Sequence, residues 1–216
     1  MTDAVIFDMD GVLIDSQPIH FEGDRITLEA HGADVPFAEL EAYAGTTDAY
    51  RFSKWKEKYH LDADLDSIIR EREDNMIRLV RESNASATHG VRELLGQIRT
   101  HGLKTAVASS SAMPFINTVL DKIQVKEFFD LVFTGENVEH GKPAPDIFLK
   151  TAELLHTPAG ECIVIEDSQN GVRAANAAGM KCIGYRNPTS GRQNLSTADR
   201  IITDFADIDV DYILSI

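Results

Sequence analysis

Four short stretches of the sequence carry side chains that could do chemistry, and each follows an apolar run. In FDMDGVLIDS, Asp8 and Asp10 stand directly after the apolar residues AVIF. The other three stretches supply a run of serines, a lysine in GKP and an acidic pair, namely Ser109–Ser111, Lys142, Glu166 and Asp167. Carboxylates that crowd together raise one another's pKa unless a cation lies among them. Hard oxygen ligands without histidine or cysteine select Mg²⁺ rather than zinc.

The same residue types suit phosphoryl transfer. Lys142 and the hydroxyl of Ser109 could hold an anion beside the metal. A carboxylate such as Asp8 can act as a covalent nucleophile toward phosphorus, and Asp10 could donate a proton to the leaving oxygen and later activate water. Each motif alone has an ordinary structural explanation, because a DxD pair is often a solvated turn and a serine can cap the helix that follows it. Their joint position in the fold therefore decides the interpretation.

The apolar runs are expected to form a parallel sheet. They occupy residues 4–8, 103–109, 131–134, 162–167 and 181–185, and helical patterns lie between them at 90–101, 112–123, 145–156 and 169–178. This alternation is typical of an α/β, Rossmann-like sheet with helices on both faces. In such sheets, ligands bind beyond the carboxyl ends of the strands. We therefore expect the four motifs to meet at one edge.

The segment between the first two apolar runs breaks the alternation. Residues 18–31, 48–59 and 64–82 have helical periodicity and many charges, and they show no convincing strand pattern. We expect an α/β core domain made of residues 1–15 and 86–216. An α-helical domain of residues 16–85 is expected to be inserted into it.

The composition limits the partners. The 35 acidic side chains outnumber the 21 basic ones and give a net charge of −14, which disfavours binding to nucleic acid or to anionic membranes. No apolar run approaches the length of a membrane span, and the start MTDAVIF lacks the features of a signal peptide. Cys162 and Cys182 lie in separate apolar runs, as expected for buried reduced thiols. We expect a cytoplasmic protein, a monomer by default, that acts on a small molecule.

The motifs FDMDGVLIDS, GKPAPDIF and VIEDSQNGVRAANAAGM, with the serine that closes LKTAVAS, resemble the signatures of the haloacid dehalogenase superfamily. The similarity runs through the whole chain. It is greatest to the branch of β-phosphoglucomutase and small sugar-phosphate phosphatases, in which an α-helical cap follows the first strand. The resemblance implies that Asp8 forms an aspartyl phosphate and that Asp10 is the general acid/base. It further implies phosphoryl binding by Ser109, Ser110 and Lys142, and Mg²⁺ binding by Asp8, Asp10 through its backbone carbonyl, Glu166 and Asp167.

The cap residues leave two activities open. His20 occupies the position from which a histidine of the mutases engages the acid/base aspartate. Those mutases hold the distal phosphate with an arginine that follows a glycine matching Gly45, but this chain has Asp48 there. Arg72 could substitute as the cationic group that a mutase needs. We expect a Mg²⁺-dependent phosphatase of a small phosphorylated metabolite such as a sugar phosphate, with a β-phosphoglucomutase-type mutase as the alternative.

Overall fold

The structure is a computed structural model that describes residues 2–43 and 46–216. The chain divides into two compact units. The larger unit consists of Met1–Asp15 together with Ala85–Ile216, and the smaller unit consists of Ser16–Asn84. The smaller unit is thus an insertion in the sequence of the larger one.

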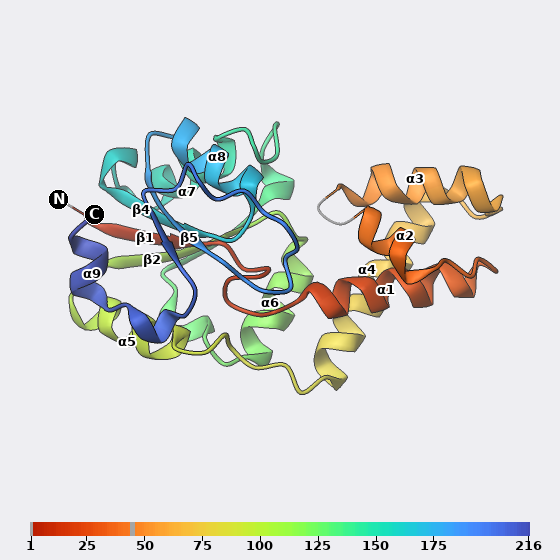
Figure 1. Cartoon of the computed structure of the whole chain (residues 1–216), viewed down its shortest axis with the longest axis horizontal. Helices are drawn as coiled ribbons and strands as arrows, with labels where there is room; N and C mark the ends of the chain where they lie inside the picture. Colours follow the sequence, from red (N-terminus) through yellow and green to blue (C-terminus); the bar gives the residue numbers. More distant parts are fainter. Residues whose placement is uncertain (1, 44–45) are drawn as a thin grey trace. The chain divides into compact units, whose positions relative to one another are not determined.

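The larger unit contains a six-stranded parallel sheet in the order β3-β2-β1-β4-β5-β6 (Figure 1). Its strands are β1 (Ala4–Phe7), β2 (Lys104–Ser109), β3 (Leu131–Thr134), β4 (Cys162–Glu166), β5 (Lys181–Tyr185) and β6 (Arg200–Ile202). The run AVIF forms β1, and all four of its residues are fully buried. A continuous apolar run is what a central parallel strand requires, because both of its faces are covered. The predicted Rossmann-like α/β fold is confirmed.

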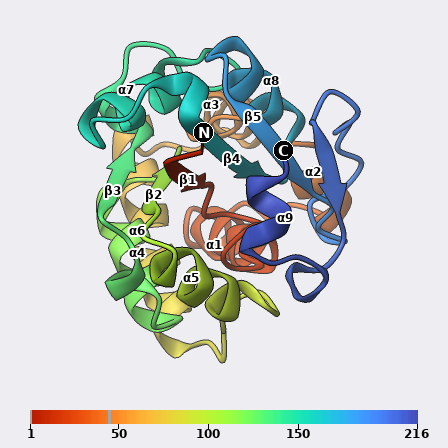
Figure 2. The same cartoon turned by 90° about the vertical axis from the view of Figure 1, so that its left-hand side faces the viewer.

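Helices cover both faces of this sheet (Figure 2). One face carries α7 (Asp146–Leu154) and α8 (Gln169–Ala177), and the other carries α5 (Val91–Thr100), α6 (Met113–Lys122) and α9 (Val210–Leu214). Short 3₁₀ turns complete the unit at η1 (Lys126–Phe128), η2 (Gly135–Asn137), η3 (Ala159–Glu161) and η4 (Phe205–Asp207). On the α7/α8 face, Ile6, Phe148 and Val172 pack into one hydrophobic core. The helices therefore cover both faces of the sheet, so a binding site is expected at the ends of the strands.

The smaller unit is built from helices α1 (Gln17–Ala30), α2 (Phe37–Ala42), α3 (Asp48–Tyr59) and α4 (Leu65–Glu82) (Figure 1). Its own hydrophobic core includes Leu28, Phe52, Trp55 and Ile68, which are fully buried. The side chains of Thr47 and Asp64 cap α3 and α4 at their N-termini. Across the described residues, no helix is long and apolar enough to cross a membrane.

Three short elements differ from the expectation. The structure adds the helices α2 and α9 and the edge strand β6, each only three to six residues long. Such lengths are too short to display a clear period of hydrophobicity. β6 also begins with an exposed arginine and lies at the edge of the sheet, where it pairs with β5, so its sequence need not be apolar throughout.

The two cysteines are free and buried, as expected. Burial raises the pKa of Cys162 to about 11 and raises the pKa of Cys182 further above its ordinary value. Because the thiolate is the reactive form, neither cysteine of the folded protein is expected to react with Ellman's reagent at pH 8. Both should react when the protein is unfolded in guanidinium chloride. Fast release of one or two equivalents of the chromophore from the native protein would contradict this prediction.

Candidate active site

The carboxyl ends of the three central strands bring the sequence motifs together. Phe7 at the end of β1 is paired with Val107 of β2 and with Ile165 of β4, so the residues that follow lie side by side. The backbone N–H of Asp8 donates to the carbonyl of Ile165 at 2.9 Å. Ser109 and Glu166 are the last residues of β2 and β4. The convergence expected at one edge of the sheet is present.

Lys142 reaches this edge from the loop between β3 and α7. Its Nζ lies 2.5 Å from Asp8 Oδ1 and 2.6 Å from Glu166 Oε1, and it also donates to the Ala108 carbonyl at 3.3 Å. The ring of Phe148 lies beneath the ammonium group, with its centroid 4.9 Å away. Burial alone would lower the pKa of Lys142, but attraction to Asp8 and Glu166 outweighs it and raises the pKa. The lysine is therefore a fixed, buried cation.

Three buried carboxylates lie close together here, and Lys142 contacts two of them, Asp8 and Glu166. Asp8, Glu166 and Asp167 each offer an oxygen atom, and these atoms lie within 4.8 Å of one another. Burial raises the pKa of Asp8; Lys142 opposes the rise, and Glu166 adds to it. Burial and the charge of Glu166 raise the pKa of Asp167 to about 7. Three carboxylates facing one ammonium group carry excess negative charge, and an all-oxygen ligand set of this kind fits Mg²⁺.

The serines after β2 contact Asp10. Ser111 Oγ donates to Asp10 Oδ2 at 2.7 Å, and Ser109 Oγ lies 3.4 Å from the same oxygen. Ser109 is fully buried, whereas Ser110 between them is exposed. The contact of Ser111 was not predicted, because a third serine after a strand gives no indication of where its hydroxyl points. The charge of Asp10 also raises the pKa of Asp8, which places the two carboxylates in one electrostatic environment.

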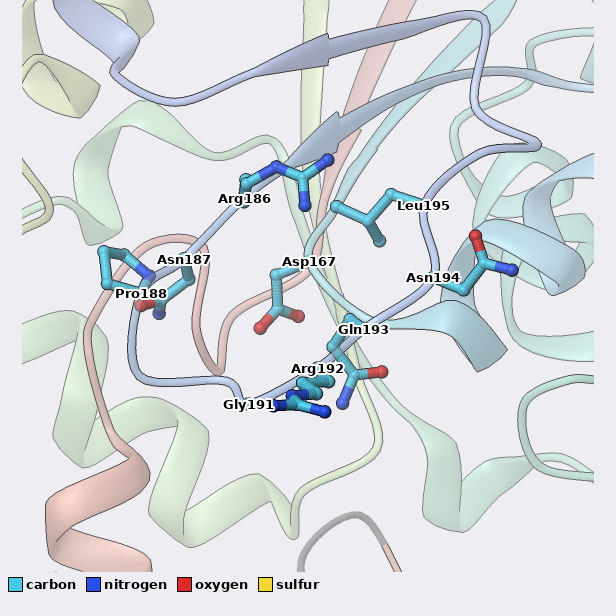
Figure 3. Close-up of a pocket in the computed structure, with 9 residues that line it drawn as sticks. All are labelled: Asp167, Arg186, Asn187, Pro188, Gly191, Arg192, Gln193, Asn194 and Leu195. Atoms are coloured by element: carbon cyan, nitrogen blue, oxygen red, sulfur yellow. The ribbon is translucent and has the colours of Figure 1, made fainter.

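A loop between β5 and β6 contacts the turn that follows β1, and no sequence pattern predicted this contact. Gly11 has a φ of 77°, and a Cβ at this position would lie 2.0 Å from Asp167 Oδ2, so only glycine fits. Asn187 Nδ2 donates to the Gly11 carbonyl at 2.9 Å, and the Ser190 hydroxyl donates to Asp167. Figure 3 shows the Asp167 carboxylate among residues of this loop, which line a cavity of about 390 Å³.

The predicted cap residues belong to the helical unit. Arg72 Nη2 lies 2.9 Å from His20 Nδ1, and because arginine can only donate, this ring nitrogen accepts. Arg72 also donates to Asp24 at 2.6 Å and to Asp48 at 2.9 Å. Gly45 lies outside the described residues. His20 and Arg72 are thus brought together, as part of an ionic network of this unit.

Asp24 is the centre of that network. It is 4% exposed and accepts from two buried arginines, Arg51 and Arg72. Breaking a buried ion pair by removing one charge costs about 3–5 kcal/mol, because the partner stays buried. Asp24→Asn is therefore expected to lower the free energy of unfolding by a similar amount, measured by urea titration. The fluorescence of Trp55, the chain's single tryptophan, reports on this unit directly.

The matched control is Glu22→Gln on the same helix. Glu22 pairs with Arg25 at 2.7 Å, but both side chains are more than 40% exposed, and such surface pairs contribute about 1 kcal/mol or less. Equal shifts of the urea midpoint in the two variants would show that the buried network does not stabilise the helical unit.

The chain is similar to several known proteins. A phosphorylated carbohydrates phosphatase of Thermotoga maritima is 31% identical over 181 residues, which cover 84% of this chain and 83% of that protein. The solved structure of CbbY from Rhodobacter sphaeroides in complex with phosphate has a TM-score of 0.85 at 26% identity and covers 96% of each chain. The structure of β-phosphoglucomutase from Clostridium difficile has a TM-score of 0.84 at 25% identity, and the match covers 100% of this chain and 96% of that one.

The model of the haloacid dehalogenase-like hydrolase family matches residues 5–185, a segment that contains all four motifs and most of the sheet. The resemblance predicted from these motifs is thereby confirmed, and the chain belongs to the haloacid dehalogenase-like hydrolases.

Proposed function

We propose that the protein is a Mg²⁺-dependent phosphatase that hydrolyses a small phosphorylated metabolite, with sugar phosphates as the substrate class. The observation that carries this proposal is the buried pair of Asp8 and Lys142, 2.5 Å apart, inside a cluster of carboxylates at the sheet edge. A nucleophilic carboxylate next to a fixed cation suits attack on a phosphoryl group, whose charge the cation offsets. The named activity of the phosphorylated carbohydrates phosphatase supports the substrate class.

In the first step, a carboxylate oxygen of Asp8 attacks phosphorus, and the bond between phosphorus and the leaving oxygen breaks. Asp10 transfers its proton to that oxygen, so the alcohol leaves neutral. In the second step, water attacks the phosphorus of the aspartyl phosphate and gives a proton to Asp10. The bond to Asp8 then breaks, and inorganic phosphate leaves. Lys142, Ser109 and Ser110 hold the phosphoryl oxygens through both steps.

The residues that would hold Mg²⁺ are Asp8, Glu166, Asp167 and the backbone carbonyl of Asp10. When bound, the ion supplies positive charge that stabilises the phosphoryl oxygens as their charge develops. The crowding of buried carboxylates, and the raised pKa values of Asp8 and Asp167, support this assignment.

The cap residues favour a phosphatase over a mutase. A mutase must also bind the non-reacting phosphate of a bisphosphate, and this needs an available cation. In the helical unit, Arg51 and Arg72 are both ion-paired to Asp24 and Asp48, so two positive charges meet two negative ones. The position of His20 and the likeness to a solved β-phosphoglucomutase keep the mutase as the second candidate. We also propose that residues 16–85 form the family's α-helical cap.

A phosphate-release screen over sugar phosphates, nucleotides and pyrophosphate tests the proposal. Release from a sugar phosphate is expected with Mg²⁺ and should stop in EDTA; activity that is unchanged in EDTA would contradict the metal assignment. A second assay follows conversion of β-glucose 1-phosphate to glucose 6-phosphate with a bisphosphate primer. Robust conversion without net phosphate release would make the mutase the better assignment.

A further inference from the structure

We propose that Ser111 is a positioning residue that orients the carboxylate of Asp10 for proton transfer. This inference rests on the proposed function, in which Asp10 protonates the leaving oxygen. Ser111 Oγ lies 2.7 Å from Asp10 Oδ2, a distance typical of a hydroxyl that donates to a carboxylate. Hydrogen bonds to a charged acceptor are roughly twice as strong as neutral ones. The contact to Ser109 Oγ is longer, at 3.4 Å, so Ser111 makes the stronger of the two serine contacts to Asp10.

The backbone of Ser111 is held on both sides by buried strand ends. Its N–H donates to Ser109 Oγ at 3.1 Å, and its carbonyl accepts from Thr134 Oγ1 at 2.7 Å. Ser109 and Thr134 are paired residues at the ends of β2 and β3, and they are 0% and 2% exposed. The hydroxyl of Ser111 therefore extends from a fixed backbone position. Such support keeps a catalytic group in one orientation before the substrate binds.

The ordinary role of a serine at this place would be to cap α6, and the structure assigns that role elsewhere. The N-cap residue of α6 is Ala112, which provides no side-chain hydrogen bond. The N–H of Met113 in the first turn donates instead to Glu136 Oε2 at 3.1 Å. The ordinary structural explanation of a serine here, a cap on the following helix, therefore does not hold for Ser111. The hydroxyl of Ser111 is directed at Asp10 rather than at the helix end.

Removal of the Ser111 hydroxyl should slow the hydrolysis of a phosphate ester by an amount that depends on the basicity of its leaving group. A sugar phosphate releases a strongly basic alkoxide, so its cleavage depends on a well-placed proton donor. p-Nitrophenyl phosphate releases a weakly basic phenolate that needs no proton. A loss of orientation at Asp10 therefore slows formation of the aspartyl phosphate from the sugar phosphate and spares the same step for p-nitrophenyl phosphate. The later attack of water also uses Asp10, but it is the same for both esters and follows release of the alcohol, so it does not enter kcat/KM. A general defect of the fold or of phosphoryl binding would slow both.

The test compares Ser111→Ala with wild type in the presence of Mg²⁺. The substrates are p-nitrophenyl phosphate and whichever of glucose 1-phosphate, glucose 6-phosphate and fructose 1-phosphate the wild type hydrolyses fastest. We expect kcat/KM to fall about 10- to 100-fold for the sugar phosphate and to stay within about 2-fold for p-nitrophenyl phosphate. Ser111→Thr keeps the hydroxyl and should recover much of the loss. Ser111→Gly also removes the hydroxyl. It should show the same larger loss of kcat/KM for the sugar phosphate than for p-nitrophenyl phosphate.

Thr118→Ala is the matched control, because it removes a partly exposed hydroxyl that donates to the Pro114 carbonyl within α6. It should leave both substrates unaffected. Equal losses on both substrates in Ser111→Ala and Ser111→Gly, or no loss on either, would overturn the role of Ser111 alone. A wild type that hydrolyses neither ester would instead overturn the proposed function and this inference with it.

Discussion

Asp8→Asn is expected to abolish phosphate release while the fold stays intact. The carboxylate of Asp8 is the proposed nucleophile, and the amide that replaces it cannot form the aspartyl phosphate. Loss of a catalytic nucleophile lowers kcat by about 10⁴-fold or more. The amide has nearly the same shape as the carboxylate. Its oxygen can still accept from Lys142, whose Nζ lies 2.5 Å from Asp8 Oδ1 in the wild-type structure. The measurement is steady-state phosphate release with Mg²⁺, together with near-ultraviolet circular dichroism as the test of folding.

The covalent intermediate gives a second measurement of the same prediction. Wild type that is quenched during turnover should yield a peptide around Asp8 carrying one added phosphoryl group by mass spectrometry, and Asp8→Asn should not. Asp121→Asn is a suitable control, because the Asp121 side chain is 63% exposed and pairs with Lys126 on the surface. Turnover at the wild-type rate in Asp8→Asn, or a phosphoryl group found on another residue, would assign the nucleophile elsewhere.

The meeting of Asp8, Lys142 and the acidic pair could be predicted because it follows from local patterns. Each motif stands after an apolar run, and the ends of neighbouring parallel strands share one edge of the sheet. The strand order, in which β1 lies between β2 and β4, then brings the ends of three strands together. A short apolar run and the residue after it are readable in the sequence. For this reason the fold and the principal residues of the candidate site could be predicted from the sequence.

The partners that support the site could not be predicted, because they depend on contacts between distant segments. Asn187 contacts Gly11 from 176 residues away, and Arg72 contacts Asp24 from 48 residues away. The sequence around an asparagine or an arginine does not indicate which residue its side chain will contact. An arginine on a helix is also more often exposed to solvent than buried in an ion pair. Arg72 is instead 5% exposed. The backbone position of Ser111 likewise depends on Thr134, which ends the next strand and donates to the Ser111 carbonyl.

The second large effect is expected at Lys142, and it concerns stability as well as activity. Lys142→Met removes the cation that contacts Asp8 and Glu166 and leaves those carboxylates buried. Loss of one partner from a buried ion pair costs about 3–5 kcal/mol. The methionine can retain part of the packing against Phe148, so the main loss is electrostatic. We expect the free energy of unfolding, measured by urea titration in EDTA, to fall by this amount. Phosphate release, measured separately with Mg²⁺, should fall to background.

Added Mg²⁺ separates this electrostatic explanation from a simple packing defect. A ligand that binds only the folded state stabilises it in proportion to the logarithm of its concentration over its Kd. Without the lysine, the three carboxylates present more uncompensated charge, so the variant should gain more stability from Mg²⁺ than the wild type gains. Lys150→Met is the control, because Lys150 is 43% exposed and pairs with Glu153 on the surface. A Lys142→Met protein that Mg²⁺ stabilises no more than Lys150→Met would contradict the view that the lysine and the metal neutralise the same carboxylates.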